Sequence, residues 1–266
     1  MIYVKKLDGT TQKYNPFKLR NSLSSAGADK EVIDKIMQKV DKILYNGIET
    51  RELFKFVFKE FKKEQPNIAP IYDLRNSLLR LGREGFAFEK FVSYILKKQG
   101  YSIKMNQIVK GRFVKHEIDV SAVKNNERMM VECKYHLKPW IRCDIQTALY
   151  VYARFLDVKK FFTTPMLVTN TKFSNQAIDY SKGVGLKLMG WKFPQNNSLE
   201  FNVEKFRLFP ITMLSSLAKE DVDILISNNI ILLRDLSAKT ADEISGMLKT
   251  TRLKADKILE ESKKLL

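Results

Sequence analysis

The sequence predicts a multidomain α/β protein: a small helical N-terminal part with a β-hairpin, a mixed sheet flanked by helices, and an all-α C-terminal part made of helical hairpins. Three observations predict this fold class. An Asp-Gly turn joins two short strand-like segments near the N-terminus, strand-like segments then alternate with helical ones in the middle of the chain, and no strand signal follows residue 205. The expected domains are 1–82, 83–204 and 205–266, which 266 residues can accommodate.

Residues 1–82 are expected to form the hairpin and about four helices. The strands "IYVKKL" and "TTQKYN" flank the turn "DGT". Apolar residues then recur at helical spacing, and Thr50 is the expected N-cap of the third helix. The four helical segments are "PFKLRNSLSSAG", "KEVIDKIMQKVDKILYNG", "TRELFKFVFKEFKKE" and "IYDLRNSLLRLG".

Residues 83–204 are typical of an α/β core. A helix over "GREGFAFEKFVSYILKKQG" precedes three strands in series, "YSIKMNQIV", "HEIDVSAV" and "RMMVECKYH". The segments "CDIQTALYVYARFLD" and "SNQAIDYSKGV" are helical, and each precedes a short apolar strand, "PMLVTN" and "LKLMGW". This order predicts a mixed sheet with helices on its faces. Residues 205–266 contain only short helical segments, which we expect to form two helical hairpins.

The chain is strongly basic, with a net charge of +17 and a pI near 9.7. The middle part has 20 Lys and Arg against 11 Asp and Glu, giving +9, whereas the N- and C-terminal parts have +6 and +2. This balance favours nucleic acid as a partner, and the alternative is a basic protein without one. No apolar run is long enough to span a membrane and no secretion signal is recognisable, so we expect a cytoplasmic protein.

A carboxylate and a lysine share one face of a strand in "VECKYH". Glu132 and Lys134 are two residues apart, and Asp119 lies on the preceding strand, "HEIDV". Two neighbouring carboxylates repel each other unless a cation lies between them, and Mg²⁺ accepts such ligands while keeping several waters. Lys134 would orient or deprotonate an attacking water or stabilise the transition state at a phosphate. The simpler interpretation is an ion pair at a sheet edge.

The ordered set of motifs resembles the PD-(D/E)xK nucleases, and among them the Mrr-type restriction endonucleases. The resemblance covers about residues 83–190 and rests on "GFAFEKFVSYILKKQGYSI", "EIDV", "VECKYH" and "DIQTALYVYARF". It implies a Mg²⁺-dependent phosphodiesterase with a restriction-endonuclease-like fold, in which Asp119 and Glu132 hold the metal, Lys134 acts beside them, Glu89 assists from the first helix, and Gln146 belongs to the same site. The sequence departs from the family in "KGRFVKHEIDV", which lacks the glycine common before the aspartate.

The N-terminal segment contains a second candidate phosphate site. No P-loop motif is present, and Lys6 and Lys18 either converge on one anion or are two solvated lysines. The segments "VKKLDGTTQKYNPFKLRNSL", "YNGIETREL" and "IYDLRNSLLRLG" resemble an ATP-cone, with Leu7 in place of a second basic residue. The resemblance implies ATP or dATP bound under a hairpin lid without hydrolysis, a change of homo-oligomeric state, and nucleotide contacts from Val4, Lys6, Gln12, Asn15, Lys18 and Thr50.

Residues 210–266 resemble a tandem helix-hairpin-helix module, although "SNNI" and "LKTTRLK" replace its usual glycine-containing hairpins. Contact with DNA and contact with protein are equally consistent with the local charge. Together, the three parts predict a Mg²⁺-dependent DNA endonuclease of restriction type that a purine nucleoside triphosphate regulates. The alternatives are a nucleotide-responsive DNA-binding regulator with a silent nuclease fold, and a junction-resolving or repair nuclease.

Overall fold

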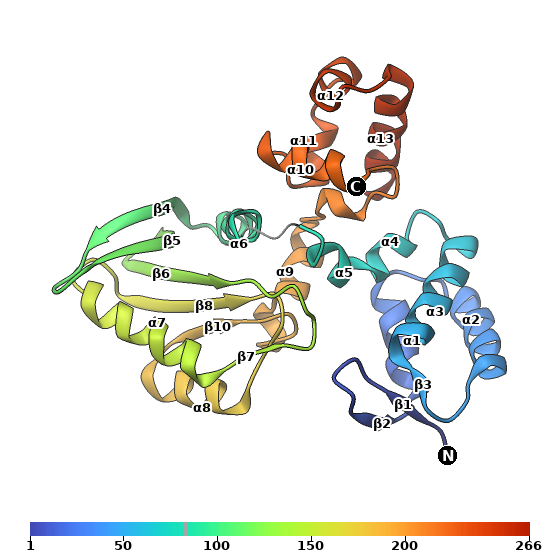
Figure 1. The fold of residues 1–266 in the computed structure, drawn as a ribbon, viewed down its shortest axis with the longest axis horizontal. Helices are drawn as coiled ribbons and strands as arrows, with labels where there is room; N and C mark the ends of the chain where they lie inside the picture. Colours follow the sequence, from blue (N-terminus) through green and yellow to red (C-terminus); the bar gives the residue numbers. More distant parts are fainter. Residues whose placement is uncertain (82–84) are drawn as a thin grey trace.

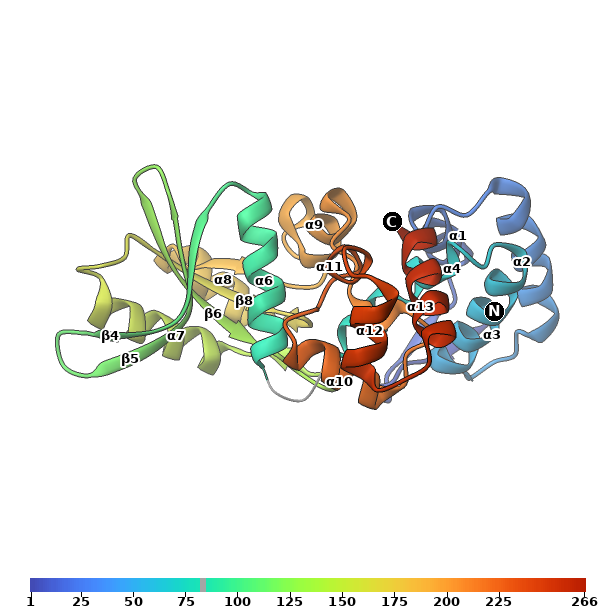
Figure 2. The ribbon, with the colours of Figure 1, turned by 90° about the horizontal axis from the view of Figure 1, so that it is seen from above.

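The computed structural model describes residues 1–81 and 85–266. The N-terminal part and the sheet lie at opposite ends of the molecule, and the C-terminal helices lie beside the region between them (Figures 1 and 2). The expected domain boundary at 82/83 lies outside the described residues, as does the start of the helix expected from residue 82. None of the described helices combines the length and the apolar character needed to cross a bilayer.

A small sheet and a helical layer make up the N-terminal part. The expected hairpin is formed by β1 (Tyr3–Lys5) and β2 (Thr11–Lys13), and β3 (Ile48–Glu49) adds a parallel strand that the sequence patterns did not reveal. Gly9 takes a positive φ of 82° in the turn, which glycine adopts without steric cost. The helices that follow are α1 (Pro16–Ser25), α2 (Lys30–Ile43), α3 (Thr50–Glu64), α4 (Ala69–Tyr72) and α5 (Leu74–Leu78).

The first four of these helices share an apolar core with β1 and β3. Leu23, Ile36, Val40, Val57 and Phe61 are fully buried in it. The expected capping role of Thr50 is wrong: this residue is the first of α3, the cap position is held by the preceding glutamate, and no side chain caps the helix there. The helix follows β3 without a loop, so the residue before it is still in extended conformation and takes the cap position.

The middle part is built on a five-stranded mixed sheet with the order β10-β8-β6-β5-β4. The antiparallel strands β4, β5 and β6 come first in the chain, and β6, β8 and β10 are parallel because helices connect them. The strands are β4 (Ser102–Lys110), β5 (Lys115–Lys124), β6 (Glu127–Lys134), β8 (Thr164–Thr169) and β10 (Lys187–Met189), and a separate parallel pair is formed by β7 (Arg142–Cys143) and β9 (Lys172–Phe173).

Helices cover both faces of this sheet, as the alternation of strands and helices predicts. Helices α7 (Ile145–Val158) and α8 (Asn175–Val184) cover one face, and α6 (Phe86–Lys98) lies on the other (Figure 1). Ile118 and Met130 point toward α7 and α8, whereas Val120 and Val131 point toward α6. The fold is therefore a restriction-endonuclease-like mixed sheet flanked by helices.

The C-terminal part is all-α. Its helices are α10 (Lys219–Ser227), α11 (Leu233–Ser237), α12 (Ala241–Leu248) and α13 (Arg252–Leu265), and α9 (Leu199–Phe206) precedes them with the single 3₁₀ turns η1 (Gln195–Asn197) and η2 (Ile211–Met213). Helix α9 spans the expected boundary at 204/205, and that boundary stays a prediction.

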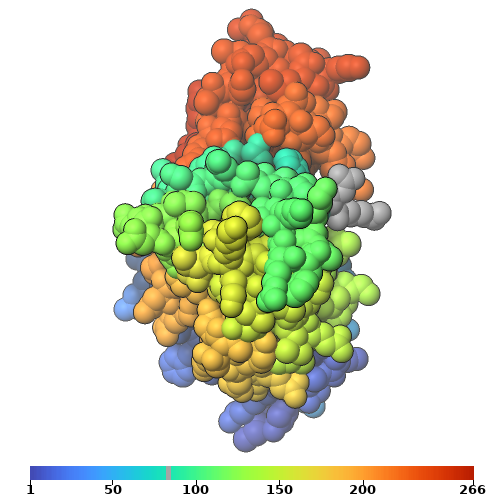
Figure 3. Space-filling view, turned by 90° about the vertical axis from the view of Figure 1, so that its left-hand side faces the viewer, coloured from blue at the N-terminus to red at the C-terminus, as the bar shows by residue number. Residues whose placement is uncertain are grey.

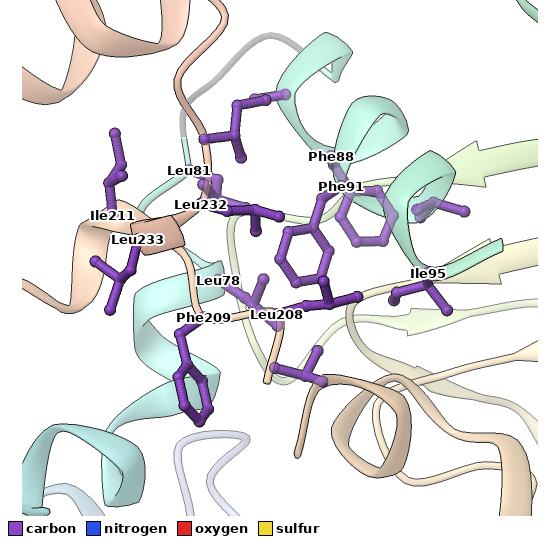
Figure 4. Close-up of a cluster of buried hydrophobic side chains, with 14 of the residues drawn as sticks. Leu78, Leu81, Phe88, Phe91, Ile95, Leu208, Phe209, Ile211, Leu232 and Leu233 are labelled. Atoms are coloured by element: carbon purple, nitrogen blue, oxygen red, sulfur yellow. The ribbon is translucent and has the colours of Figure 1, made fainter. Parts of the chain in front are cut away.

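A continuous apolar core joins the C-terminal helices to the sheet. Phe88, Phe91 and Ile95 project from α6 toward Leu208 and Leu232, and all five side chains are at most 1% exposed (Figure 4). Leu78 and Leu81, which follow α4, belong to the same core. Fully burying a side chain of this size contributes about 1.5–3 kcal/mol, so the C-terminal part is firmly attached to the nuclease-like sheet.

Candidate functional site

The first candidate residue, Asp119, lies at a change of face in β5. Ile118 contacts the core under α7, whereas Val120, two residues later, contacts the core under α6. A regular strand would place both on one side. Opposite this point on β4, Asn106 has a positive φ of 50°, and the pairing of β4 with β5 is interrupted there. The regular alternation is broken at this position, and the carboxylate of Asp119 reaches the backbone of Cys133 near the end of β6.

Glu132 lies beside Asp119 on the neighbouring strand. The pairing of β5 with β6 reaches Val120 and Val131, so the next residues in register are Asp119 and Glu132. The backbone N–H of Cys133 donates to Oδ2 of Asp119 at 2.7 Å. Cys133 itself faces the α6 core, as its position between Glu132 and Lys134 predicts. The two carboxylates therefore meet at one end of the sheet.

The surroundings of the two carboxylates disfavour their charged forms. Burial, followed by the negative charge of Asp119, raises the pKa of Glu132 to about 7, although Arg154 opposes the shift. Burial also raises the pKa of Asp119, against the hydrogen bond from the Cys133 amide. Since burial and like charge both penalise ionisation, this pair is a place where a cation would be held.

Arg154 on α7 is the partner that sequence reasoning missed. Its guanidinium makes an ion pair with Glu132 and donates to the backbone carbonyl of Glu117, and its side chain is only 10% exposed. It also lies over the ring of Tyr150, 5.4 Å from the centroid. The available signal was spacing, because Gln146, Tyr150 and Arg154 recur every four residues and such positions neighbour each other on a helix.

The remaining nuclease candidates surround this pair at different depths. Lys134 ends β6 and is exposed. Glu89 on α6 is half-buried and accepts a hydrogen bond from Asn106 Nδ2 at 3.1 Å, while burial raises its pKa, with a smaller contribution from the charge of Asp119. Gln146 lies in the first turn of α7 and is exposed, and no hydrogen bond joins it to the carboxylates. The structure thus brings Glu89, Asp119, Glu132 and Lys134 to one region and leaves Gln146 at its margin.

The donor set fits a cation that keeps most of its own waters. Within residues 1–81 and 85–266, no three His, Cys, Asp or Glu side chains are grouped as metal ligands. Asp119 and Glu132 together supply two carboxylates, which is few for zinc but sufficient for Mg²⁺, which binds through one or two carboxylates plus waters and phosphate oxygens. The electrostatic penalty on these two groups is the observation that supports a divalent cation here.

The candidate nucleotide residues lie around the small N-terminal sheet. Val4 pairs with Gln12 and with Ile48, so it occupies the centre of the three strands. The side chain of Asn15 caps α1 by accepting from the amides of Phe17 and Lys18, at 2.9 and 3.4 Å.

Two helices also begin next to this sheet. Thr50 starts α3 directly after β3, and α1 starts three residues after β2. The strand before α1 and the strand before α3 both pair with β1, so both helices begin at the edges of one small sheet, and the N-terminus of a helix carries partial positive charge. Lys6 and Lys18 are exposed. This arrangement suits an anion.

Three family models match the chain. The ATP cone domain matches residues 2–71, the restriction endonuclease model of the Mrr type matches 82–191, and the AF1548-like C-terminal model matches 209–266. The recognised resemblances to an ATP-cone and to an Mrr-type nuclease are confirmed. The last match shows that the C-terminal helices are similar to the C-terminal part of AF1548-like proteins, and the resemblance of these helices to helix-hairpin-helix modules stays a prediction.

Individual relatives match about two thirds of the chain. An uncharacterized protein of Archaeoglobus fulgidus is 39% identical over 173 residues, which are 65% of this chain and 98% of that protein. The crystal structure of AF1548, a protein of unknown function, superposes with a TM-score of 0.61 at 37% identity over 68% of this chain and 98% of that chain. The MspJI restriction endonuclease, solved with a 27-mer oligonucleotide, reaches 12% identity and a TM-score of 0.33 over 78% of this chain and 38% of its own, which is too low to carry an argument.

Proposed function

The chain belongs to the AF1548-like family, with an ATP-cone domain preceding the nuclease fold, and we propose that it is a Mg²⁺-dependent DNA endonuclease of restriction type that ATP or dATP regulates without being hydrolysed. The meeting of Asp119 and Glu132 beside Lys134 carries this proposal. The net charge of +17 supports DNA as the substrate, because Lys and Arg neutralise backbone phosphates.

Each residue of the site has a role that its environment supports. Asp119 and Glu132 would hold the cation, and Mg²⁺ when bound acidifies a water and neutralises charge at the scissile phosphate. Lys134, exposed at the strand end, would contact the attacking water or the phosphate. Glu89 lies beyond Asn106 and would act through water, and Arg154 orients Glu132. Gln146, at the margin, would contact DNA next to the cut.

Plasmid cleavage tests this assignment. Asp119→Asn and Lys134→Ala should each lower the cleavage rate with Mg²⁺ by about 1000-fold, because electrostatic stabilisation of this kind amounts to several kcal/mol. Binding of a labelled duplex should persist in both variants. Lys257→Ala, which removes an exposed lysine of the C-terminal part, is the matched control. A wild-type rate in either active-site variant would show that these residues do not form the catalytic site.

The Arg154 ion pair favours a second candidate, a DNA-binding regulator whose nuclease site is silent. A buried arginine that occupies the metal-binding carboxylate competes with a cation for it. If this is the function, wild-type protein binds DNA but does not cut it with Mg²⁺ or Mn²⁺. Cleavage that is lost on Lys134→Ala excludes the regulator. Branched duplexes cut in preference to linear plasmid would instead indicate a junction-resolving or repair nuclease.

Regulation by nucleotide is supported by the position of the β1–β2 hairpin. Hydrogen bonds from Thr10 lower the pKa of Asp8 at the hairpin tip, and the positive charge of Arg142 on β7 lowers it slightly further. Lys6 contributes to the positive field that, after burial, lowers the pKa of Lys172 on β9. The hairpin therefore lies near the short strands β7 and β9. Strand β7 follows Lys134 in the chain, and Figure 1 shows the hairpin on the side of the N-terminal part that is turned toward it.

Nucleotide held by the hairpin would change this contact, and it can alter cleavage only if it binds one arrangement better than another. Calorimetry should detect ATP or dATP binding to the full chain, weakened by the double substitution Lys6→Ala, Lys18→Ala. Light scattering should detect a change of homo-oligomeric state, and cleavage should respond to nucleotide. If neither nucleotide gives a heat of binding, the proposed nucleotide site is wrong. If nucleotide binds but changes neither assembly nor cleavage, the site stands and the proposed regulation is wrong.

A further inference from the structure

The β4–β5 hairpin exposes apolar side chains at and near its tip, and none of them belongs to an apolar core. Phe113 is 77% exposed, Val114 57% and Ile108 65%. The hairpin extends to the end of the molecule farthest from the N-terminal part (Figures 1 and 3). We call residues 110–116 the arm tip. Phe113 and Val114 are adjacent, so together they leave an apolar surface at a projecting tip.

The arm tip is held rigidly by one residue of α7, Asp157. The carboxylate of Asp157 accepts from the backbone N–H of Phe113 at 2.9 Å and of Val114 at 3.3 Å, and it contacts His116 Nε2 at 2.8 Å. Its backbone carbonyl accepts from the N–H of Arg112 at 2.9 Å. These four contacts fix the backbone of the tip on a helix that also carries Arg154.

The turn is shaped to admit this carboxylate. A Cβ added to Gly111 would lie 2.1 Å from Asp157 Oδ2, so only glycine allows the close approach. The guanidinium of Arg112 lies over the ring of Phe113, 4.9 Å from its centroid. The tip therefore presents an arginine and an aromatic ring in a preformed arrangement, which lowers the entropy lost on binding.

Charge identifies the class of partner. Residues 110–116 contain three basic residues, Lys110, Arg112 and Lys115, and no acidic ones. A positively charged, partly apolar tip is complementary to a groove of DNA, where basic side chains contact phosphates and apolar groups contact bases. A second copy of the chain would bring an equally positive tip to the interface in a two-fold arrangement, and like charges oppose that contact.

We propose that the arm tip enters the major groove of the DNA substrate and that Arg112 and Phe113 contact base edges there. A two-stranded β-ribbon fits the major groove, an arginine matches the acceptors of guanine, and an apolar side chain matches the methyl group of thymine. Phe113 is six residues from Asp119 along the chain, which corresponds to at most about 20 Å, or roughly six base pairs from the cleaved bond. The inference rests on the proposed DNA substrate.

The test uses the full chain with a fluorescein-labelled 30-base-pair duplex in Ca²⁺, followed by sequencing of plasmid ends cut in Mg²⁺. Phe113→Ala and Arg112→Ala should each weaken duplex binding about tenfold. They should also reduce any base preference within about six base pairs of the cut. Leu253→Ala, which truncates an 81% exposed leucine in the C-terminal part, should change neither. Asp157→Ala should also reduce the base preference, although Phe113 is still present, because the contacts that hold the backbone of the arm tip are lost.

The outcomes separate this inference from the proposed function. If both arm variants bind the duplex with wild-type affinity and cut at wild-type sites, the proposed role of the arm tip is wrong. Cleavage in the same experiment would still support the proposed nuclease activity. Arm variants that bind the duplex normally but lose a dimer in light scattering show that the tip contacts a second copy instead. If the wild-type protein does not bind the duplex, both the proposed DNA substrate and the proposed role of the arm tip are wrong.

Discussion

The two junctions on either side of the nuclease-like sheet differ in chemistry. On the C-terminal side, Phe91, Leu208 and Leu232 are fully buried in one apolar core that runs from α6 to α13. On the N-terminal side, the ATP-cone has a core of its own that ends at α4, and the contacts toward the sheet include the hydrogen bond from Arg75 Nη2 to the Pro139 carbonyl at 2.8 Å and the charges around Lys172.

This difference indicates which junction can move. Apolar burial is lost in full when a well-packed interface opens, whereas hydrogen bonds and charges can be exchanged for water at little net cost. The C-terminal helices therefore act as a fixed support for α6 and its Glu89. The ATP-cone is the part whose position a bound nucleotide could alter, since its own core does not include the sheet and Ile71 on α4 is its apolar link to the core of α6.

The largest expected effect comes from opening the apolar junction. Leu232→Ala should lower the free energy of unfolding of the nuclease-like and C-terminal parts by about 2–5 kcal/mol, because it removes a fully buried side chain. Both parts should unfold in one transition in a urea titration. Leu253→Ala, on an exposed side chain of the same part, should change stability by no more than about 0.5 kcal/mol. Equal losses in the two variants would contradict a shared core.

A smaller effect is expected at the polar junction. Arg75→Met removes the donor to Pro139 and should lower the free energy of unfolding by about 1 kcal/mol. Nε of the half-buried guanidinium has no hydrogen-bond partner. Removing the guanidinium therefore also removes an unfavourably buried charge, and this limits the loss of stability. Hydrogen exchange should become faster in residues 135–141, the segment that Arg75 holds.

Arg80→Met is the matched control for this experiment. Arg80 donates to the Thr212 carbonyl at 3.1 Å and pairs with Asp73, so it contacts the C-terminal side. Its substitution should leave exchange in residues 135–141 at the wild-type rate. Faster exchange there in both variants would mean that the two junctions are not independent.

A third effect lies inside the ATP-cone and depends on pH. Lys39 and Lys63 donate to Glu60 at 2.8 and 2.6 Å and lower its pKa from 4.5 to about 2. A lowered pKa in the folded state stabilises the fold above the unfolded value, and this stabilisation is lost as pH falls from about 4.5 to about 2. Thermal melts should show Glu60→Gln below the wild type at pH 7 and close to it at pH 2.5. A constant difference across this range would exclude the ion pairs as its cause.

Periodic and local patterns were sufficient for most of the architecture. The β1–β2 turn, the strands β4, β5 and β6, and helix α7 were predicted because alternation and helical spacing act within a few residues. Two-residue strands such as β3, β7 and β9 were missed, since two residues establish no period. Thr50 was misassigned as a cap because β3, which decides where α3 begins, is formed by pairing with β1.

The sequence by itself determined the fold class, the likeness to an ATP-cone and to an Mrr-type nuclease, and the presence of Asp119, Glu132 and Lys134 on neighbouring strands, because a period of two residues defines which side chains share a face. The tertiary structure alone decided that Arg154 pairs with Glu132, that Asp157 fixes the arm tip, and that the C-terminal helices share the core of α6. Each of these depends on contacts between residues that are 22 or more positions apart. Such contacts follow from how twisted strands and packed helices meet in space, and no spacing along one element encodes them.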